Sequence, residues 1–233
     1  MNDSFVSDDN QQVVDTIDQN EIIIDEPSES IVPNPKIEKS LHKGDDDVII
    51  QENTFVEGSY NLSEKESKQK TLADVHKYAG IYIFNDNEPI CEYLILGRVR
   101  VGVSWSSEYE GVRNHLVKKS LKSYPQCDGI ILNLSDGGED LATIIKFSNP
   151  QEKEKWGYAK VNLFNGLYIF SDCTPINNYT IIGRSKSVVT WSGQYDGVKS
   201  NLIKRALKSF PQAQGIILDM HRGGVDRGVI ISF

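Results

Sequence analysis

The sequence predicts an α+β fold of tandem duplicated β-β-α-β-β domains, each a small antiparallel sheet with one covering helix, after a disordered acidic N-terminal tail. Three observations support this prediction: a gapless internal repeat, strand and helix patterns within each repeat, and a change of charge near residue 80. Residues 80–147 and 166–233 align at a constant offset of 86, and 34 of the 68 aligned positions are identical. A repeat of this length sets the organisation of the chain.

Each repeat opens with two segments that have strand patterns. Residues 81–84 form a short apolar run, which is followed by turn-forming residues up to Pro89. Residues 93–103 then alternate apolar side chains with Arg98 and Arg100, which is typical of a strand with one charged face. The second repeat has the same patterns 86 residues later. We therefore expect two strands at the start of each domain.

A helix follows in each repeat. Apolar residues recur at helical spacing in residues 109–124 and 195–210. A proline comes directly after each segment, at Pro125 and Pro211. Because proline disrupts a helix interior, each helix should end there.

Two further strands complete each repeat. In the first repeat, residues 129–132 and 143–147 are rich in apolar residues and flank a tight turn at Gly137 and Gly138. The second repeat matches this pattern. One helix on one face of an antiparallel sheet is the simplest way to bury these apolar stripes.

These patterns divide the chain into four parts. We expect a disordered acidic tail (1–75), a first repeat domain (76–148), a linker (149–165) and a second repeat domain (166–233). A domain of about 60–70 residues buries only about 60% of its unfolded surface and is marginal alone. The two domains should therefore pack together or self-associate.

The tail is strongly acidic. Residues 1–79 carry 7 Lys and Arg against 18 Asp and Glu, whereas residues 80–233 carry 18 against 15. The few apolar side chains of the tail cannot offset the entropy of ordering its backbone, so we expect disorder.

Two aliphatic islands in the tail lie beside acidic residues. Such islands suit the addition of a strand to a partner's sheet edge, where the acids would meet a basic rim. Both resemble SUMO-interacting motifs. The islands consist of Ile22, Ile23 and Ile24, and of Val48, Ile49 and Ile50.

The repeats also resemble a known type of domain. A glycine in a long strand, an amphipathic helix, a DGIIL segment and a strand that ends in KF are similar to YbjQ-type domains, small bacterial β-β-α-β-β domains described as heavy-metal-binding. Uncharacterised repeat domains of Bacteroidetes are similar in the same way. The likeness covers residues 93–147 and 179–233. It implies the β-β-α-β-β fold and self-association.

The metal-binding label of that family is not matched by this chain. A residue required by chemistry common to both repeats should occur in both, but neither His115 nor His221 has a histidine at the equivalent position. No histidine pairs with a cysteine at zinc-ligand spacing. No shared histidine is present to activate a nucleophile. We therefore expect no metal, no cofactor and no enzymatic activity.

The three cysteines, Cys91, Cys127 and Cys173, are not part of the repeat. An odd, unpatterned set argues against a disulfide framework and favours a reducing compartment. The chain begins with acidic and polar residues and has no apolar run of about 20 residues. A cytoplasmic location is the expectation.

Two groups of residues are candidates for binding. Aromatic residues dominate protein interfaces, so those near the helix starts, together with the tail islands, are candidates for partner contact: Trp105, Tyr109, Trp191 and Tyr195. Paired basic residues of the long strands are candidates for binding an anionic ligand or nucleic acid: Arg98, Arg100, Arg184 and Lys186. Core packing and solubilisation are the structural alternatives for the two groups.

The leading hypothesis for function is a non-enzymatic protein-binding or assembly module. Its two pseudo-symmetric small domains would form a platform, and the acidic tail would recruit or tether. One alternative is the binding or processing of a phosphorylated ligand or nucleic acid through the paired basic residues. A further alternative is a SUMO-binding adaptor that acts through the tail islands.

Overall fold

Strands predominate in the computed structural model of the chain. The residues that it describes also include two α-helices and one 3-10 helix, so the predicted α+β class is confirmed. The described residues are 50–56, 71–102, 108–134, 139–187, 194–220 and 225–233.

The first half of the fold, residues 72–147, follows strand β1 (Ile50–Val56). Its elements are β2 (Leu72–Val75), β3 (Lys77–Tyr78), β4 (Ile81–Phe84), β5 (Asn87–Pro89), β6 (Tyr93–Val101), α1 (Tyr109–Ser123), β7 (Gly129–Asn133) and β8 (Asp140–Phe147).

The second half, residues 158–233, follows the 3-10 helix η1 (Pro150–Lys155). Its elements lie about 86 residues after those of the first half: β9 (Tyr158–Val161), β10 (Leu163–Phe164), β11 (Leu167–Ser171), β12 (Cys173–Pro175), β13 (Thr180–Lys186), α2 (Tyr195–Ser209), β14 (Gly215–Asp219) and β15 (Arg227–Ser232).

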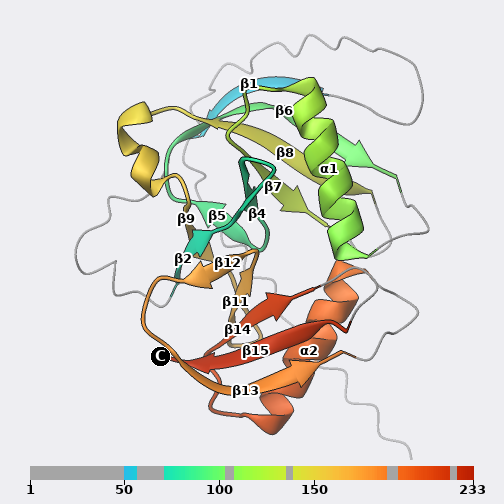
Figure 1. The fold of residues 1–233 in the computed structure, drawn as a ribbon, viewed down its shortest axis with the longest axis vertical. Helices are drawn as coiled ribbons and strands as arrows, with labels where there is room; N and C mark the ends of the chain where they lie inside the picture. Colours follow the sequence, from blue (N-terminus) through green and yellow to red (C-terminus); the bar gives the residue numbers. More distant parts are fainter. Residues whose placement is uncertain (1–49, 57–70, 103–107, 135–138, 188–193, 221–224) are drawn as a thin grey trace, which may run out of the picture. The chain divides into compact units, whose positions relative to one another are not determined.

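Each half has one larger sheet, and the two sheets correspond strand for strand except for β1, which has no counterpart among the described strands of the second sheet (Figure 1). The order is β1-β6-β8-β7-β4-β3 in the first and β13-β15-β14-β11-β10 in the second. The expectation of a purely antiparallel sheet is wrong, because β4 lies parallel to β7 and β11 lies parallel to β14. The first and second predicted strands form no hairpin. Instead the chain leaves the sheet after β4, forms β5 in another sheet, and returns to the first sheet as β6. Strand β4 pairs with β7, which follows helix α1.

A third sheet is built from both halves. Its order is β12-β2-β9-β5, so strands of the second and first halves alternate (Figure 1). Ala73 of β2 lies opposite Ala159 of β9, its counterpart 86 residues later. Equivalent residues that face each other are the mark of a two-fold relation between the halves. The shared sheet therefore exists only when the two halves are in contact.

Two apolar clusters hold these layers together, and each contains residues of both halves. The first lies under the helices and includes the fully buried Leu116 and Leu202. The second packs the opposite faces of the larger sheets against the shared sheet, with Phe84, Phe170 and Ala73 fully buried. Both faces of each larger sheet thus contribute to the core.

The long strand β6 does not alternate without interruption. Its register against β8 shifts between Ile95 and Gly97. As a result Tyr93 packs against the second cluster and Val99 belongs to the first, although the uninterrupted pattern predicts one face for both. A bulge inserts one residue and reverses the alternation beyond it.

Two predicted boundaries differ from the structure. The segment 149–165, expected as a linker, contains η1, β9 and β10, and β9 is an inner strand of the shared sheet. The segment 1–75, expected as a disordered tail, contains β1 and β2 among its described residues. The repeat is weak here, since within residues 72–79 only Ala73 and Val75 recur 86 residues later.

Replacement of Ala159 by proline tests whether residues 158–161 are a strand or a linker. Strand β9 has neighbours on both sides, so proline would remove a ladder hydrogen bond and strain an inner strand. We expect Ala159→Pro to lower the free energy of unfolding by about 3 kcal/mol or more in urea denaturation. The control Asn178→Pro lies in an exposed loop and should cost less than about 1 kcal/mol. Equal effects of the two substitutions would contradict the strand assignment.

Candidate functional site

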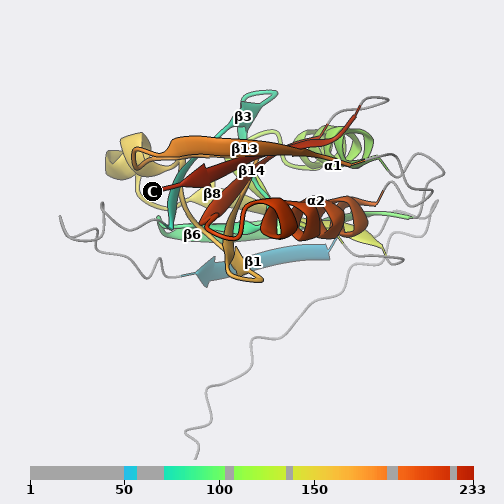
Figure 2. The same cartoon turned by 90° about the horizontal axis from the view of Figure 1, so that it is seen from below.

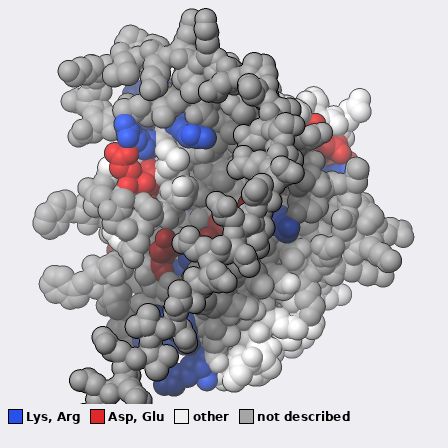
Figure 3. Space-filling view, turned by 180° about the vertical axis from the view of Figure 1, so that it is seen from behind, with Lys and Arg blue, Asp and Glu red and all other residues white. Residues whose placement is uncertain are grey.

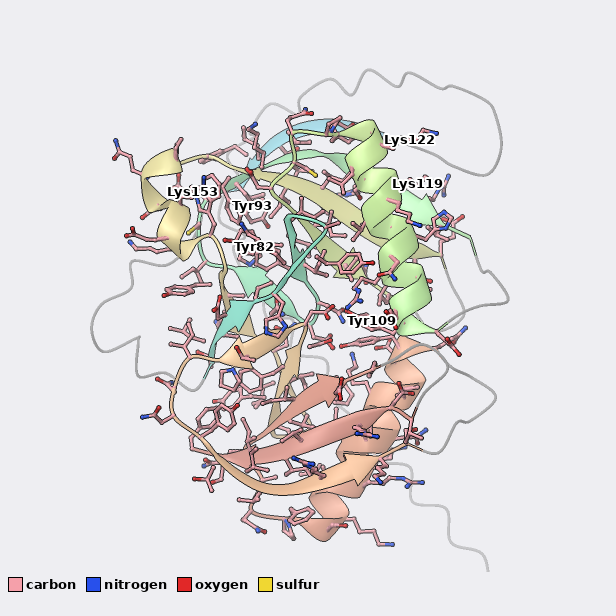
Figure 4. The ribbon with its side chains drawn as sticks, in the orientation of Figure 1. Tyr82, Tyr93, Tyr109, Lys119, Lys122 and Lys153 are labelled. Atoms are coloured by element: carbon pink, nitrogen blue, oxygen red, sulfur yellow. The ribbon has the colours of Figure 1, made fainter. Side chains whose placement is uncertain are left out.

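The helices of the two halves meet at their first turns. Tyr109 begins α1 and Tyr195 begins α2, and their ring centroids are 4.9 Å apart. Figure 4 shows Tyr109 at the end of α1 that points toward the second half. Both side chains are buried, so the ring pair closes the apolar cluster between the helices.

Each of these tyrosines donates a hydrogen bond to an aspartate of the other half. Tyr109 donates to Asp172, and Tyr195 donates to Asp86 at 2.5 Å. The donors are 86 residues apart, and so are the acceptors. This reciprocity is what an isologous interface between two copies produces.

Two cations on the helices make the same crossing. The guanidinium of Arg113 lies 2.8 Å from Asp172, and the ammonium of Lys199 lies 3.0 Å from Asp86. Arg113 and Lys199 are again equivalent positions. Each aspartate thus accepts from one neutral and one charged donor of the opposite helix, and such charge-assisted bonds are stronger than neutral ones.

A tight turn aims each aspartate across the interface. The φ angles of Asp86 and Asp172 are 56° and 51°, in the left-handed region that aspartate tolerates better than most residues. The preceding residues, Asn85 and Ser171, form a β-bridge with each other. Asn85 also donates a hydrogen bond to the hydroxyl of Ser171 at 2.8 Å. The turns of the two halves are therefore in direct contact.

Tyr109, Tyr195 and Lys199 keep one protonation state at neutral pH. Burial and the negative charge of the facing aspartate raise the pKa of Tyr109 and of Tyr195 well above the ordinary value. Burial lowers the pKa of Lys199, but the charge and hydrogen bonds of Asp86 and Asp196 raise that pKa by more. The tyrosines are thus neutral donors and Lys199 is charged. None of these three groups titrates near pH 7, where a general acid or base has to work.

The predicted partner-binding residues Tyr109 and Tyr195 therefore lie inside the chain. Their exposed fractions are 6% and 5%, and their contacts join the two halves. Trp105 and Trp191 lie outside the described residues, as does the first tail island, Ile22 to Ile24.

The outer strand of the first half carries an additional strand. β1 pairs antiparallel with β6, with Ile50 opposite Arg98 and Val56 opposite Tyr93 (Figure 2). Ile50 is the last residue of the second tail island, whose other two residues lie outside the described ranges. A segment that follows an acidic run thus covers one sheet edge within this chain.

The equivalent strand of the second half, β13, has an open side. No strand among the described residues pairs with β13 on the side away from β15. Ile181 of β13 is 53% exposed, whereas its counterpart Ile95 in β6 is half-buried. Likewise Arg184 is exposed and its counterpart Arg98 is half-buried. The difference follows from the cover that β1 gives to β6.

A pocket of about 230 Å³ lies between β13 and α2. The guanidinium of Arg205 donates a hydrogen bond to the carbonyl oxygen of Lys186 at 3.0 Å, which fixes this cation beside β13. Gly183 lets the ring of Phe210 pack on the strand, because a Cβ there would overlap the ring. The pocket is lined by Arg184, Ser185, Lys186, Arg205, Ser209, Phe210 and Ile230.

The predicted anion-binding residues fall into two separate pairs. Arg184 and Lys186 line the pocket beside α2. Arg98 and Arg100 lie on β6 in the other larger sheet, where Arg100 pairs with Glu139 at 2.7 Å. In the view from behind, Lys and Arg side chains lie both at the upper end, beside acidic side chains, and at the lower end, where the second half lies (Figure 3).

Sequence reasoning missed Ser185 and Arg205. It looked for residues shared by both repeats, whereas the first repeat has Val99 in place of Ser185 and Lys119 in place of Arg205. Differences between the repeats on β13 and α2 were the available signal.

Comparisons give no further guide to the site. No family model, curated protein or solved structure matches the chain. The described part of the chain contains no group of three or more His, Cys, Asp or Glu that could hold a metal ion. Within the same residues, no helix is long and apolar enough to cross a membrane.

Removal of one aspartate charge tests the contact between the halves. We expect Asp86→Asn to lower the free energy of unfolding by about 1–3 kcal/mol, since it leaves buried Lys199 with Asp196 as its acidic partner. The control Glu139→Gln removes an exposed ion pair and should cost less than about 1 kcal/mol. Urea denaturation measures both values. An effect of Asp86→Asn no larger than that of the control would show that the crossing contact contributes little.

Alkaline pH should also weaken this contact. The folded-state pKa of Tyr109 and Tyr195 is raised, so their contribution to stability is complete below the unfolded-state pKa of about 10 and is lost as the pH rises above it. Melting temperatures measured from pH 8 to 11 should therefore fall above about pH 10. The fall should be shallower in the double variant Tyr109→Phe, Tyr195→Phe. An equal pH dependence in both proteins would contradict this role of the tyrosines.

Proposed function

We propose that this protein is a non-enzymatic binding module whose β13 edge receives an extended acidic segment of a partner protein. The observation that carries the proposal is the difference between two equivalent edges. β6 is covered by β1, whereas β13 has an open side among the described residues. β6 and β13 are equivalent in the sequence repeat and share a register shift at equivalent positions, so a strand that fits one edge should fit the other.

Backbone hydrogen bonding supplies the affinity in this proposal. An edge strand presents unpaired N–H and C=O groups, and an added strand satisfies them. The chain itself provides an example, since β1 pairs antiparallel with β6 along most of its length.

Charge gives the proposed partner its acidic character. Exposed Arg184 and Lys186 lie on β13, and exposed Arg205 lies beside that strand. The segment that covers β6 begins at Ile50, and two residues separate it from the acidic run Asp45–Asp47. An acidic strand would be attracted to β13 and a basic one repelled.

A peptide with the sequence of residues 44–56 is the probe that tests strand addition. We expect this peptide, labelled with fluorescein, to bind the full chain with micromolar affinity in fluorescence anisotropy. In hydrogen exchange it should protect the amides of Thr180–Lys186 and leave those of β6 unchanged, because β1 already covers β6.

Charge reversal provides the matched control. Arg184→Glu with Lys186→Glu should weaken peptide binding at least about tenfold, whereas Lys204→Glu with Lys208→Glu, on the exposed side of α2, should change it less than about threefold. The proposal fails if the peptide does not bind, or if it binds without protecting β13.

A further inference from the structure

The pocket beside β13 has the size of one side chain. Its volume of about 230 Å³ is below the range of roughly 300–1,000 Å³ that is typical of small-molecule sites. Because it lies between β13 and α2, a strand added to β13 would direct alternate side chains toward it. One side chain of a docked strand therefore has a place to enter.

The pairing of β1 shows which side chain this would be. Ile50 lies opposite Arg98 on β6, and Arg184 is the equivalent of Arg98 on β13. In the same register on β13, the preceding residue of a docked strand lies opposite Ser185. Directly opposite residues of an antiparallel pair have their side chains on the same face. The residue at the position of Ile49 would thus share the helix-facing side with Ser185.

The lining of the pocket matches a phosphoryl group. Arg205 of α2 lines the pocket on the helix side, and Arg184 and Lys186 flank Ser185 on β13. Within the part of the chain that the structure describes, no ion pair joins any of these three cations to a carboxylate. A phosphorylated side chain carries about −1.5 to −2 charges at pH 7 and three acceptor oxygens, so it gains more than a carboxylate does from Arg205 in the pocket and from the positive charge of Arg184 and Lys186 along the strand edge.

A buried hydroxyl on the pocket wall supports this assignment independently of charge. Ser185 is 7% exposed and its Oγ has no hydrogen-bond partner. The first half has Val99 at this position, which fills the space without an unsatisfied polar atom. A rotation of the Ser185 side chain toward the pocket would let its hydroxyl donate a hydrogen bond to a phosphoryl oxygen there.

We propose that this pocket binds the phosphoryl group of a phosphorylated residue in the acidic strand that docks on β13. The inference rests on the proposed function, because docking places the residue beside the pocket. It adds a regulated partner: phosphorylation of the strand strengthens its binding to β13.

Three peptides of residues 44–56 test this inference on the full chain. The first peptide carries Ile49→Ser, and the second carries phosphoserine at position 49. The third keeps Ile49 and carries phosphoserine at position 51 in place of Gln51. We expect the phosphoserine at position 49 to bind about tenfold more tightly than the unphosphorylated serine peptide. The phosphoserine at position 51 lies opposite Gly183, farther from Arg205, and should give less than about a threefold gain.

Two substitutions that copy the first half identify the pocket. Ser185→Val and Arg205→Lys install the residues found at Val99 and Lys119, so the fold should accept both. In each variant, the ratio of the dissociation constant of the unphosphorylated position-49 peptide to that of the phosphorylated one should fall from about ten to less than about three. That ratio is insensitive to any general change in strand docking.

The outcomes separate the two proposals. If both position-49 peptides protect β13 but bind equally well, the phosphoryl pocket is wrong and strand docking stands. If the phosphorylated peptide binds more tightly and the two substitutions do not reduce the ratio, the phosphoryl group lies elsewhere and the pocket assignment is wrong. If neither peptide binds, strand docking fails and the pocket inference fails with it.

Discussion

The pairing of β2 with β9 joins the two halves into one structure, because each of these strands also carries a strand of the opposite half on its other side. Ala73 and Ala159 face each other at the centre and are fully buried. A domain of this size is marginal alone. Exchange of strands gives the inner face of each larger sheet an apolar layer that one half by itself does not provide. The aspartate contacts then fix the helices around the same two-fold relation.

The residues that make the crossing contacts have kept their chemistry in both halves, whereas some residues of the outer strands have not. At the interface tyrosine matches tyrosine, aspartate matches aspartate, and Arg113 matches Lys199. At the outer edges Ser185 takes the place of Val99, and β13 is more exposed than β6. An interface that uses both copies constrains both, since a change in one removes a partner from the other. The outer edges have no such constraint, and that is where a binding surface can differ between the halves.

The elements of the repeat were predictable where a local pattern determines the structure. The helices at Tyr109 and Tyr195 follow from apolar spacing and a terminal proline, and the final strands follow from apolar runs beside a glycine turn. The parallel pairing of β4 was not predictable, because it depends on where β5 goes rather than on any property of residues 81–84. Strand β9 was missed for a different reason. Ala159 and Val161 alternate with polar Lys160 and Asn162, but this short pattern lies before the aligned part of the second repeat, where a linker was expected.

The candidate site lay outside the reach of a search for shared residues, and its charges alone have two explanations. Lys and Arg on an edge strand hinder pairing between identical edges, which accounts for Arg184 and Lys186 as protection against self-association. Protection does not require the hydroxyl of Ser185, however, and a buried hydroxyl without a partner costs about 1–3 kcal/mol that valine would avoid. A bound state in which that hydroxyl has an acceptor would offset this cost. A basic edge repels its own copy and attracts an acidic strand, so the charges of β13 fit both protection against self-association and recognition of a partner. Ser185 is the residue that distinguishes recognition from protection.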